Sequence, residues 1–301
     1  MRNRALPLLL LAVPLLMWGT GYRATAVGEA HGPALMFAAL RNIPSIVGGG
    51  VLLALYRERV PRGRNGLLMA GNGLLMVSLF IWALTEGVAR AGAANTSVLV
   101  STSPLFTAIL SRAVFQEALP PRRVAGLALG FGGVATMFSS ELRIGGGQVA
   151  AGMGIAVLAG LAWAVGTIVV KAAGRGLDPV PVAALQYVVG APIVISVAFA
   201  SRGTAGTQWS SGELWAMSAY VGIGGLAGSL AFFAALRLIS ATETTTVQFA
   251  IPVVAVLVEV IRGNTPAAVS FVGMALAVAG VGLVLAPART ARIGVPSRAE
   301  T

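Results

Sequence analysis

The sequence contains no cysteine and a single histidine, His31, in 301 residues. The lack of cysteine excludes disulfides and thiol chemistry, and one histidine cannot build a Cys/His metal site. The sequence also lacks a GxxxxGK[ST] phosphate loop, an HExxH motif and a histidine partner for a serine nucleophile. We therefore expect no metal, no cofactor, no ATP hydrolysis and no enzymatic activity.

Charge is scarce as well. Only 10% of the residues are charged, whereas a soluble domain has about a quarter. Hydrophobic residues make up 56% and the mean hydropathy is +0.85. A soluble fold could not bury this much apolar surface, so we infer that the chain lies in a lipid bilayer as helices or a closed barrel. The apolar runs are continuous rather than alternating, which favours helices.

The charges that are present give a net charge of +11, which is also typical of nucleic-acid-binding proteins. Their placement in alternate loops and in the tail argues against nucleic acid as a partner. The basic residues at these places are Arg57, Arg59, Arg62, Arg64, Arg122, Arg123, Lys171, Arg175, Arg289, Arg292 and Arg298. The positive-inside rule assigns these loops to the cytoplasm, together with both chain ends, the first of which carries Arg2 and Arg4. We expect a multi-pass protein of the cytoplasmic (inner) cell membrane.

The two halves of the chain resemble each other. Residues 16–21 and 38–42 match residues 161–166 and 183–187 at one offset, and residues 103–106 match 251–254 at nearly the same offset. Gly126 and Gly133 correspond in the same way to Gly273 and Gly280. A tandem duplication of apolar segments predicts a membrane transporter with its substrate site between two related halves. The apolar start, although similar to a signal peptide, belongs to the folded unit because its Trp18 region has a counterpart.

The lengths of the apolar runs and the breaks between them predict an all-α integral membrane fold with about ten transmembrane helices. We expect a first repeat of five helices over residues 1–140, a linker over 141–148, a second repeat over 149–287, and a basic cytoplasmic tail over 288–301. Because five is odd, the second repeat enters the membrane from the opposite side, which makes an inverted five-plus-five repeat around a central cavity. The expected spans lie near residues 5–26, 33–56, 66–86, 93–115, 122–139, 149–171, 180–200, 213–236, 242–262 and 267–286.

The fourth and ninth spans each carry a polar stripe. Ser97, Ser101, Pro104 and Ser111 share one helix face, as do Thr245, Gln248, Pro252 and Glu259. Such stripes face the bundle interior or water rather than lipid. Pro104 and Pro252 are predicted helix kinks near the midplane. Hydrogen bonds from the hydroxyls to their own helices are the alternative interpretation.

Other polar and aromatic residues occur in matched pairs within the apolar spans. Trp18, followed by Tyr22, corresponds to Trp163, and Arg41-Asn42 corresponds to Gln186-Tyr187. An arginine embedded in a span is costly unless it has a partner or water, which makes Arg41 a functional candidate; the alternative is that it extends to the headgroups. The predicted substrate cavity is lined by Trp18, Tyr22, Arg41, Asn42, Trp163, Gln186, Tyr187 and Gln248.

Three acidic residues, Glu86, Glu243 and Glu259, lie in the spans near their ends. A carboxylate in a membrane whose pKa is raised by desolvation can carry protons, so these residues are candidates for proton coupling. An interfacial role, or for Glu259 an ion pair with Arg262, is the alternative.

The chain resembles the EamA-type transporters of the drug/metabolite transporter superfamily in the order of several residue groups, which are duplicated. They are Trp18-Gly19, Leu40-Arg41, Ser103-Pro104-Leu105-Phe106 with Glu117, Gly126 and Gly133, and then Trp163-Ala164, Ala235-Leu236, Pro252 and Gly273. The resemblance implies ten helices in an inverted repeat, cytoplasmic chain ends, a central cavity and, often, export of amino acids or other small metabolites. Two acidic positions common in the family are replaced here by Gly263-Asn264 and Ala250-Ile251, so their roles are not carried over.

These observations predict a secondary-active transporter that exports a small organic metabolite, such as an amino acid, by alternating access. Its expected partners are the small-molecule substrate and the bilayer, while the sequence leaves the oligomeric state open. Two other classes remain alternatives: an integral-membrane enzyme acting on a lipid-linked substrate, and a channel.

Overall fold

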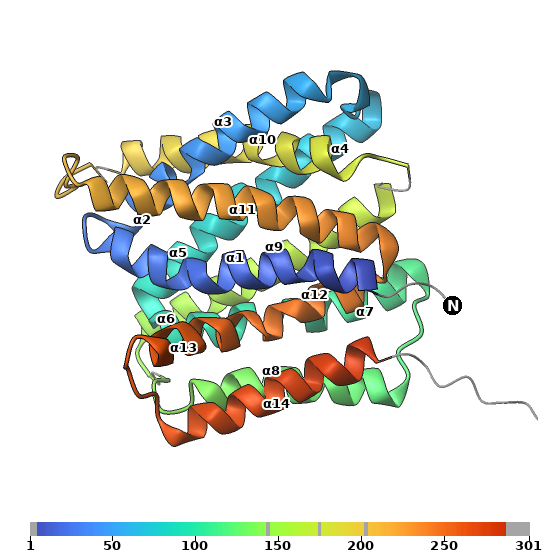
Figure 1. Ribbon diagram of the computed structural model, residues 1–301, viewed down its shortest axis with the longest axis vertical. Coiled ribbons are helices and arrows are strands. Elements are labelled where there is room, and N and C mark those ends of the chain that lie inside the picture. The colour runs from blue at the N-terminus through green and yellow to red at the C-terminus, as the bar shows by residue number, and fades with distance from the viewer. Residues whose placement is uncertain (1–4, 143–144, 174–175, 202–203, 287–301) are drawn as a thin grey trace, which may run out of the picture.

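The computed structural model describes residues 5–142, 145–173, 176–201 and 204–286, and these residues form helices and no strands (Figure 1). The predicted tail, together with Arg2, Arg4 and Arg175, lies outside the described residues. The first half contains α1 (Ala5–Glu29), α2 (Ala34–Leu40), α3 (Asn42–Leu55), η1 (Arg57–Arg59), α4 (Gly63–Gly73), η2 (Leu74–Leu79), α5 (Phe80–Ala91), α6 (Ala93–Val100), α7 (Ser103–Phe115) and α8 (Pro121–Met137). The second half contains α9 (Gly147–Ala173), α10 (Pro179–Ala200), α11 (Gly212–Leu238), α12 (Ala241–Thr245), η3 (Thr246–Phe249), α13 (Ile251–Ile261) and α14 (Ala268–Leu285).

Within these ranges, nine helical segments are long and apolar enough to cross a bilayer. The helix α8, with 17 residues, adds a tenth segment at the short end of the range that spans a membrane. The predicted all-α membrane fold is therefore confirmed. Several of the expected spans are interrupted. The breaks between α6 and α7 and at η3 lie next to Pro104 and Pro252, where the sequence predicts kinks, whereas the break at Arg41 and the π-helical turn η2 fall where it predicts continuous helices.

The equivalent helices α8 and α14 pack against each other through glycine. A Cβ atom placed on Gly126 would lie 2.8 Å from the carbonyl oxygen of Gly280, and one on Gly133 would lie 2.7 Å from that of Gly273. The reciprocal distances, from Gly280 to Gly126 and from Gly273 to Gly133, are both 2.6 Å. These pairings mean that α8 and α14 run antiparallel, as equivalent helices of an inverted repeat must.

A second pair of contacts relates the halves. The carbonyl oxygen of Arg41 lies against Gly222 in α11, and that of Gln186 lies against Gly73 in α4. Arg41 and Gln186 are equivalent in the duplication, and each packs on a glycine of the opposite half. The backbone therefore preserves the internal symmetry that the sequence predicts.

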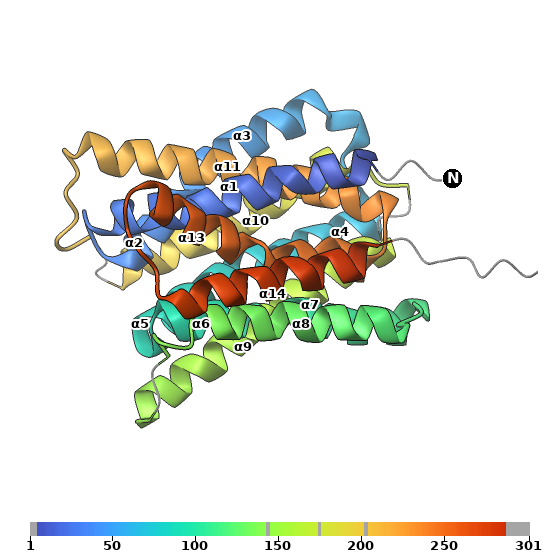
Figure 2. The same cartoon turned by 60° about the horizontal axis from the view of Figure 1, so that its bottom comes forward.

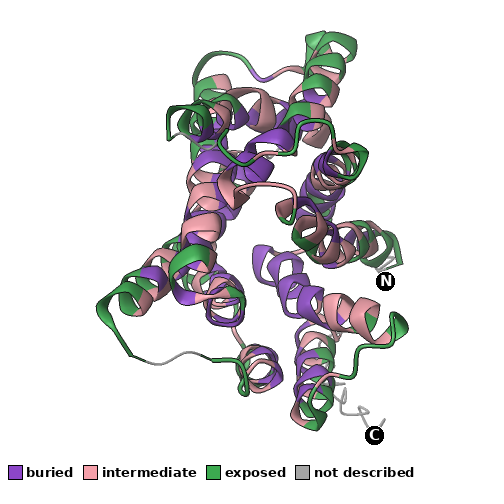
Figure 3. Ribbon diagram, turned by 90° about the vertical axis from the view of Figure 1, so that its left-hand side faces the viewer, coloured by how far each residue is buried: buried purple, intermediate pink, exposed green. Residues whose placement is uncertain are grey.

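The connections between spans lie alternately at two ends of the bundle (Figures 1 and 2). We call the end with the α1–α2, α5–α6, α10–α11 and α13–α14 connections the open end, at the left of Figure 1. The opposite end, with the α3–α4, α7–α8 and α11–α12 connections, is the closed end. Seen from the open end, exposed residues lie mainly on the periphery and buried residues face the middle of the bundle (Figure 3). Large apolar side chains on the periphery, such as Leu55 and Ile261, suit contact with lipid.

His31, in the α1–α2 connection, joins the two halves at the open end. Its Nδ1 lies 2.9 Å from Oε1 of Gln208, its Nε2 lies 2.9 Å from Oε2 of Glu213, and its carbonyl accepts a 2.8 Å hydrogen bond from the Gln208 amide. A protonated imidazole donates from both nitrogens, whereas the neutral ring donates from one. The hydrogen bonds to Gln208 and then to Glu213 therefore raise the pKa of His31 above its ordinary value.

We expect the stabilising effect of His31 to depend on pH. Because its pKa is higher in the folded protein, its contribution is fully present below about pH 6.5, the ordinary value, and is lost as the pH rises through the raised pKa. His31→Gln should therefore lower the melting temperature more at pH 5.5 than at pH 8.5. In protein purified with a tag free of histidine, NMR should show the titration of a single imidazole, with its midpoint above the ordinary pKa. An equal loss at both pH values, or a titration midpoint at or below the ordinary pKa, would contradict this prediction.

Candidate functional site

A cavity of about 320 Å³ lies in the middle of the bundle. It reaches toward the open end, where Glu29, Ala34, Val88 and Ala93 line it. Its walls come from both halves, mainly from α1, α2–α3, η2–α5, α6, α11 and the start of α13. No residue of the described closed-end connections lines it. The volume is within the range of small-molecule binding sites.

Aromatic side chains form the inner end of this cavity. The rings of Trp18 and Trp163, which are equivalent in the two repeats, meet edge to face with centroids 5.3 Å apart. Phe80 packs on Trp163 at 5.0 Å, and Phe232 packs on Trp18 at 5.9 Å. Each tryptophan is thus supported by a phenylalanine of the opposite half. Trp18, Trp163 and Phe80 line the cavity and provide an apolar surface suited to stacking with a flat or aliphatic group.

The outer part of the cavity carries its two charged residues, Arg41 and Glu29. Arg41 lies at the break between α2 and α3 and lines the cavity together with Tyr22, Glu29 and Tyr187. The side chain of Arg41 forms no hydrogen bond or ion pair with the described residues. Its guanidinium is therefore available for an anionic group.

The interruptions of the fourth and ninth spans also reach the cavity. Ser97 of α6 and Ser101, at the break that follows α6, line it, as do Gln248 of η3 and both Ile251 and Pro252 at the start of α13. Pro104 and Pro252 each lie in the first turn of the helix that follows the break, where a proline costs no intrahelical hydrogen bond. Oε1 of Gln248 is buried and has no hydrogen-bond partner in the described structure. Ser101 and Thr245, in contrast, donate to carbonyls of their own helices, at 2.8 Å and 3.0 Å.

The structure brings together seven of the eight residues predicted from the sequence to line a cavity: Trp18, Tyr22, Arg41, Asn42, Trp163, Tyr187 and Gln248. Contrary to the prediction, Gln186 does not line it. Its side chain is buried, with an unpaired Nε2, in the segment of α10 that packs against α4. Among the lining residues, sequence reasoning missed Glu29, which follows the predicted end of its span, and Phe80, whose partner Trp163 is distant in the chain.

The three predicted proton-coupling residues all lie away from the cavity. Glu86 is 2.9 Å from Arg90 in the same helix, and Glu243 forms an ion pair with Arg123 at the closed end. Glu259 lies 3.8 Å from Arg23 and accepts a 2.6 Å hydrogen bond from Asn264. The partner of Glu259 is thus Arg23 of the opposite half rather than Arg262.

Two helical repeats around a cavity open at one end define a multi-pass membrane transport protein. The chain belongs to the EamA-like transporter family, whose profile matches it twice, at residues 5–139 and 150–286. The resemblance predicted from the sequence is therefore confirmed, and with it membership of the drug/metabolite transporter superfamily.

Several proteins are similar to this chain. The uncharacterized transporter YvbV of Bacillus subtilis (strain 168) is 26% identical over 299 residues, which cover 97% of this chain and 96% of that protein. A probable amino-acid metabolite efflux pump of Salmonella typhimurium is 28% identical over 158 residues, 51% of this chain and 50% of that protein. A solved structure described only as "Crystal structure of protein" has a TM-score of 0.78 at 20% identity and covers 95% of this chain and 97% of its own. That likeness shows the fold.

Proposed function

We propose that this protein is a secondary-active carrier that exports a small metabolite bearing a carboxylate, such as an amino acid, by alternating access of two inverted repeats. The observation that carries the proposal is Arg41, a cation that lines a membrane cavity and has no ion-pair partner among the described residues. An unpaired charge in such a place is costly and typically marks a substrate site. The efflux-pump name of the Salmonella typhimurium relative supports the same substrate class.

In this proposal, the guanidinium of Arg41 binds the substrate carboxylate through two parallel hydrogen bonds. Glu29 lines the same outer region and offers a negative charge for a substrate ammonium group. The apolar part of the substrate contacts the ring surface of Trp18, Trp163 and Phe80. The cavity thus combines two opposite charges with an apolar inner end, an arrangement that suits a zwitterion.

The basic residues support the proposed orientation. Arg57, Arg59, Arg62, Arg64 and Arg122 lie at or next to the closed-end connections. By the positive-inside rule, the closed end and both chain ends are cytoplasmic, so the structure represents the state with its cavity open to the outside. We further propose that the repeats comprise residues 1–140 and 149–287, joined by 141–148; the two family matches support this division.

Purified protein in liposomes tests the proposal. A carrier loaded inside with an unlabelled amino acid should accumulate the labelled one by counterflow, saturably, whereas a channel gives flux without exchange and an enzyme gives a chemically altered product. A panel of the twenty amino acids and simple monocarboxylates, screened first by thermal stabilisation, selects the substrate because a ligand of the native state raises the melting temperature. Absence of counterflow for every stabilising ligand would contradict the proposal.

A further inference from the structure

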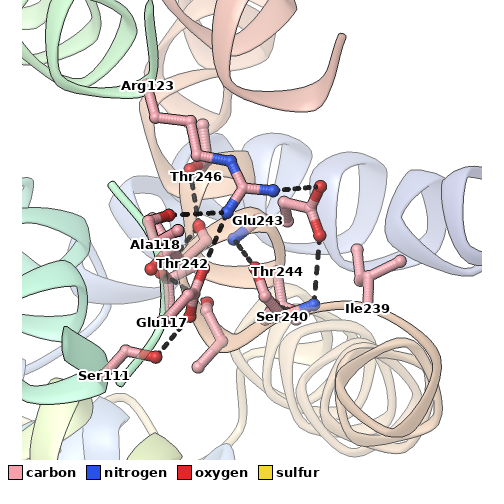
Figure 4. Close-up of polar contacts among 12 residues, drawn as sticks. Ser111, Glu117, Ala118, Arg123, Ile239, Ser240, Thr242, Glu243, Thr244 and Thr246 are labelled. Atoms are coloured by element: carbon pink, nitrogen blue, oxygen red, sulfur yellow. Dashed lines mark hydrogen bonds and ion pairs between the residues drawn. The ribbon is translucent and has the colours of Figure 1, made fainter. Parts of the chain in front are cut away.

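A buried ion-pair network joins the two halves at the closed end. Arg123, near the start of α8, contacts Oε1 of Glu117 at 3.1 Å through Nη1 and Oε1 of Glu243 at 3.0 Å through Nη2 (Figure 4). Glu117 belongs to the α7–α8 connection of the first half, and Glu243 belongs to α12 of the second. The side chains of Arg123, Glu117 and Glu243 are only 18%, 11% and 6% exposed. Solvent therefore screens these ion pairs weakly.

Each carboxylate is held in place by its own half. The Ser111 hydroxyl donates to Glu117, and the Ser240 amide donates to Oε2 of Glu243 at 3.1 Å. Ser240 and Glu243 form a capping box that fixes the first turn of α12. The two carboxylates are thus rigid parts of opposite halves, and within this cluster Arg123 is the residue that links them (Figure 4).

The internal symmetry does not repeat this network at the open end. With the offset that relates Gly126 to Gly273, Arg123 corresponds to Ser270, which donates to the carbonyl of Met137 at 2.9 Å. With the offset that relates Pro104 to Pro252, Glu243 corresponds to Asn95. The ion pairs that join the halves at the open end of the described structure are more exposed: Arg23 with Glu259, and His31 with Glu213, whose side chain is 59% exposed. Among the described residues, the buried charged cluster is specific to the closed end.

We propose that Arg123 is the gate residue of the closed end. Its two ion pairs hold the halves together while the cavity faces the open end, and both halves must release each other there before the cavity opens on the other side. The inference rests on the proposed alternating access but needs no knowledge of the substrate. A carrier built from near-symmetric repeats has similar energies in its two states, so a buried charged network at one end shifts the population of each state.

Cysteine labelling tests the gate directly, because the natural chain has no cysteine. Thr107 in α7 lies between Pro104 and Ser111 and is fully buried, whereas Ser97 lines the cavity. In nanodiscs, which expose both ends, Ser97→Cys should react readily with a water-soluble maleimide and Thr107→Cys slowly. Adding Arg123→Gln should raise the rate at Thr107→Cys at least tenfold and lower the rate at Ser97→Cys. Arg123→Lys should restore rates near those of the parent protein.

Two further variants sharpen the test. Glu243→Gln keeps the capping box, since glutamine also serves at its third position, and removes one ion pair; it should accelerate labelling at Thr107→Cys as well. Arg112→Gln removes an exposed arginine from the same end of α7 and should leave both rates unchanged, because Arg112 forms no ion pair with the described residues. Size-exclusion profiles and melting curves identify variants that fail to fold. If Arg123→Gln fails to fold, the labelling rates of Glu243→Gln decide the test.

Unchanged labelling at Thr107→Cys in folded Arg123→Gln or Glu243→Gln would overturn the gate. Equal acceleration by Arg112→Gln would overturn it too, because the effect would then come from net charge alone. The labelling result is independent of transport: a shift in labelling without counterflow of any panel ligand would leave the gate in place and reject the proposed function. Counterflow without a shift would do the reverse.

Discussion

Replacing Arg41 with alanine is expected to reduce transport of a carboxylate substrate by about 100-fold. The change removes the cation proposed to bind the carboxylate, and hydrogen bonds to charged groups contribute about 1.5–3 kcal/mol each. A 100-fold loss corresponds to about 2.7 kcal/mol. Arg41→Lys should give an intermediate rate, because lysine keeps the charge but loses the planar pair of donors. Initial rates of counterflow in liposomes provide the measurement.

The control for this prediction is Arg90→Ala. Arg90 lies at the same end of the protein, pairs with Glu86 and does not line the cavity, so its removal changes the net charge equally without touching the site. The amide analogue of the substrate adds a second control, because its binding should be weak in the parent protein and little changed by Arg41→Ala. A rate for Arg41→Ala within threefold of the parent would contradict the carboxylate role of Arg41.

Replacing Gly133 with valine is expected to abolish stable folding of the bundle. Even a single Cβ at Gly133 would overlap the backbone of α14, at the Ala277 amide and 2.7 Å from the carbonyl oxygen of Gly273. Backbone atoms cannot move aside as a flexible side chain can, so α8 and α14 would have to separate. Overpacking of this kind costs about 1–3 kcal/mol for an added methylene, and valine adds three carbon atoms. Melting temperature and monodispersity in detergent measure the effect.

Gly132 provides the matched control, because a Cβ there would meet no atom within 4 Å. Gly132→Val makes the same chemical change one residue away, on a face of α8 with free space beside it, and should lower the melting temperature only slightly. Similar losses for the two variants would show that helix propensity, rather than the contact with α14, explains the requirement for glycine.

Much of the fold was predictable because lipid imposes simple rules. Long apolar runs must be helices, and the duplicated tryptophans and glycines identify the related halves from the sequence alone. The helix breaks were harder to predict from the sequence. Pro104 and Pro252 indicated two of them, but the interruption at Arg41 and the π-helical turn at residues 74–79 have no comparable local signal, since they depend on packing against neighbouring helices.

The site was predictable only in part, for a reason that the structure makes clear. The duplication suggests that Arg41 and Gln186 have equivalent surroundings, yet Arg41 lines the cavity whereas Gln186 is buried. A cavity that is open at one end is not lined by the two repeats in the same way, and the sequence does not indicate which end is open. The contacts of Arg123 could not be predicted from the sequence either, because Glu243 is far from Arg123 in the chain and contacts it only in the folded bundle.

The glycine pairing of α8 and α14 has a consequence for how such chains can vary. Deleting one residue between Gly126 and Gly133 would rotate one glycine relative to the other by about 100° around the helix. A bulky side chain would then occupy the place of a hydrogen atom between two backbones. Insertions and deletions should therefore accumulate in the connections at either end of these helices, while the seven-residue spacing of the glycines stays fixed in both copies.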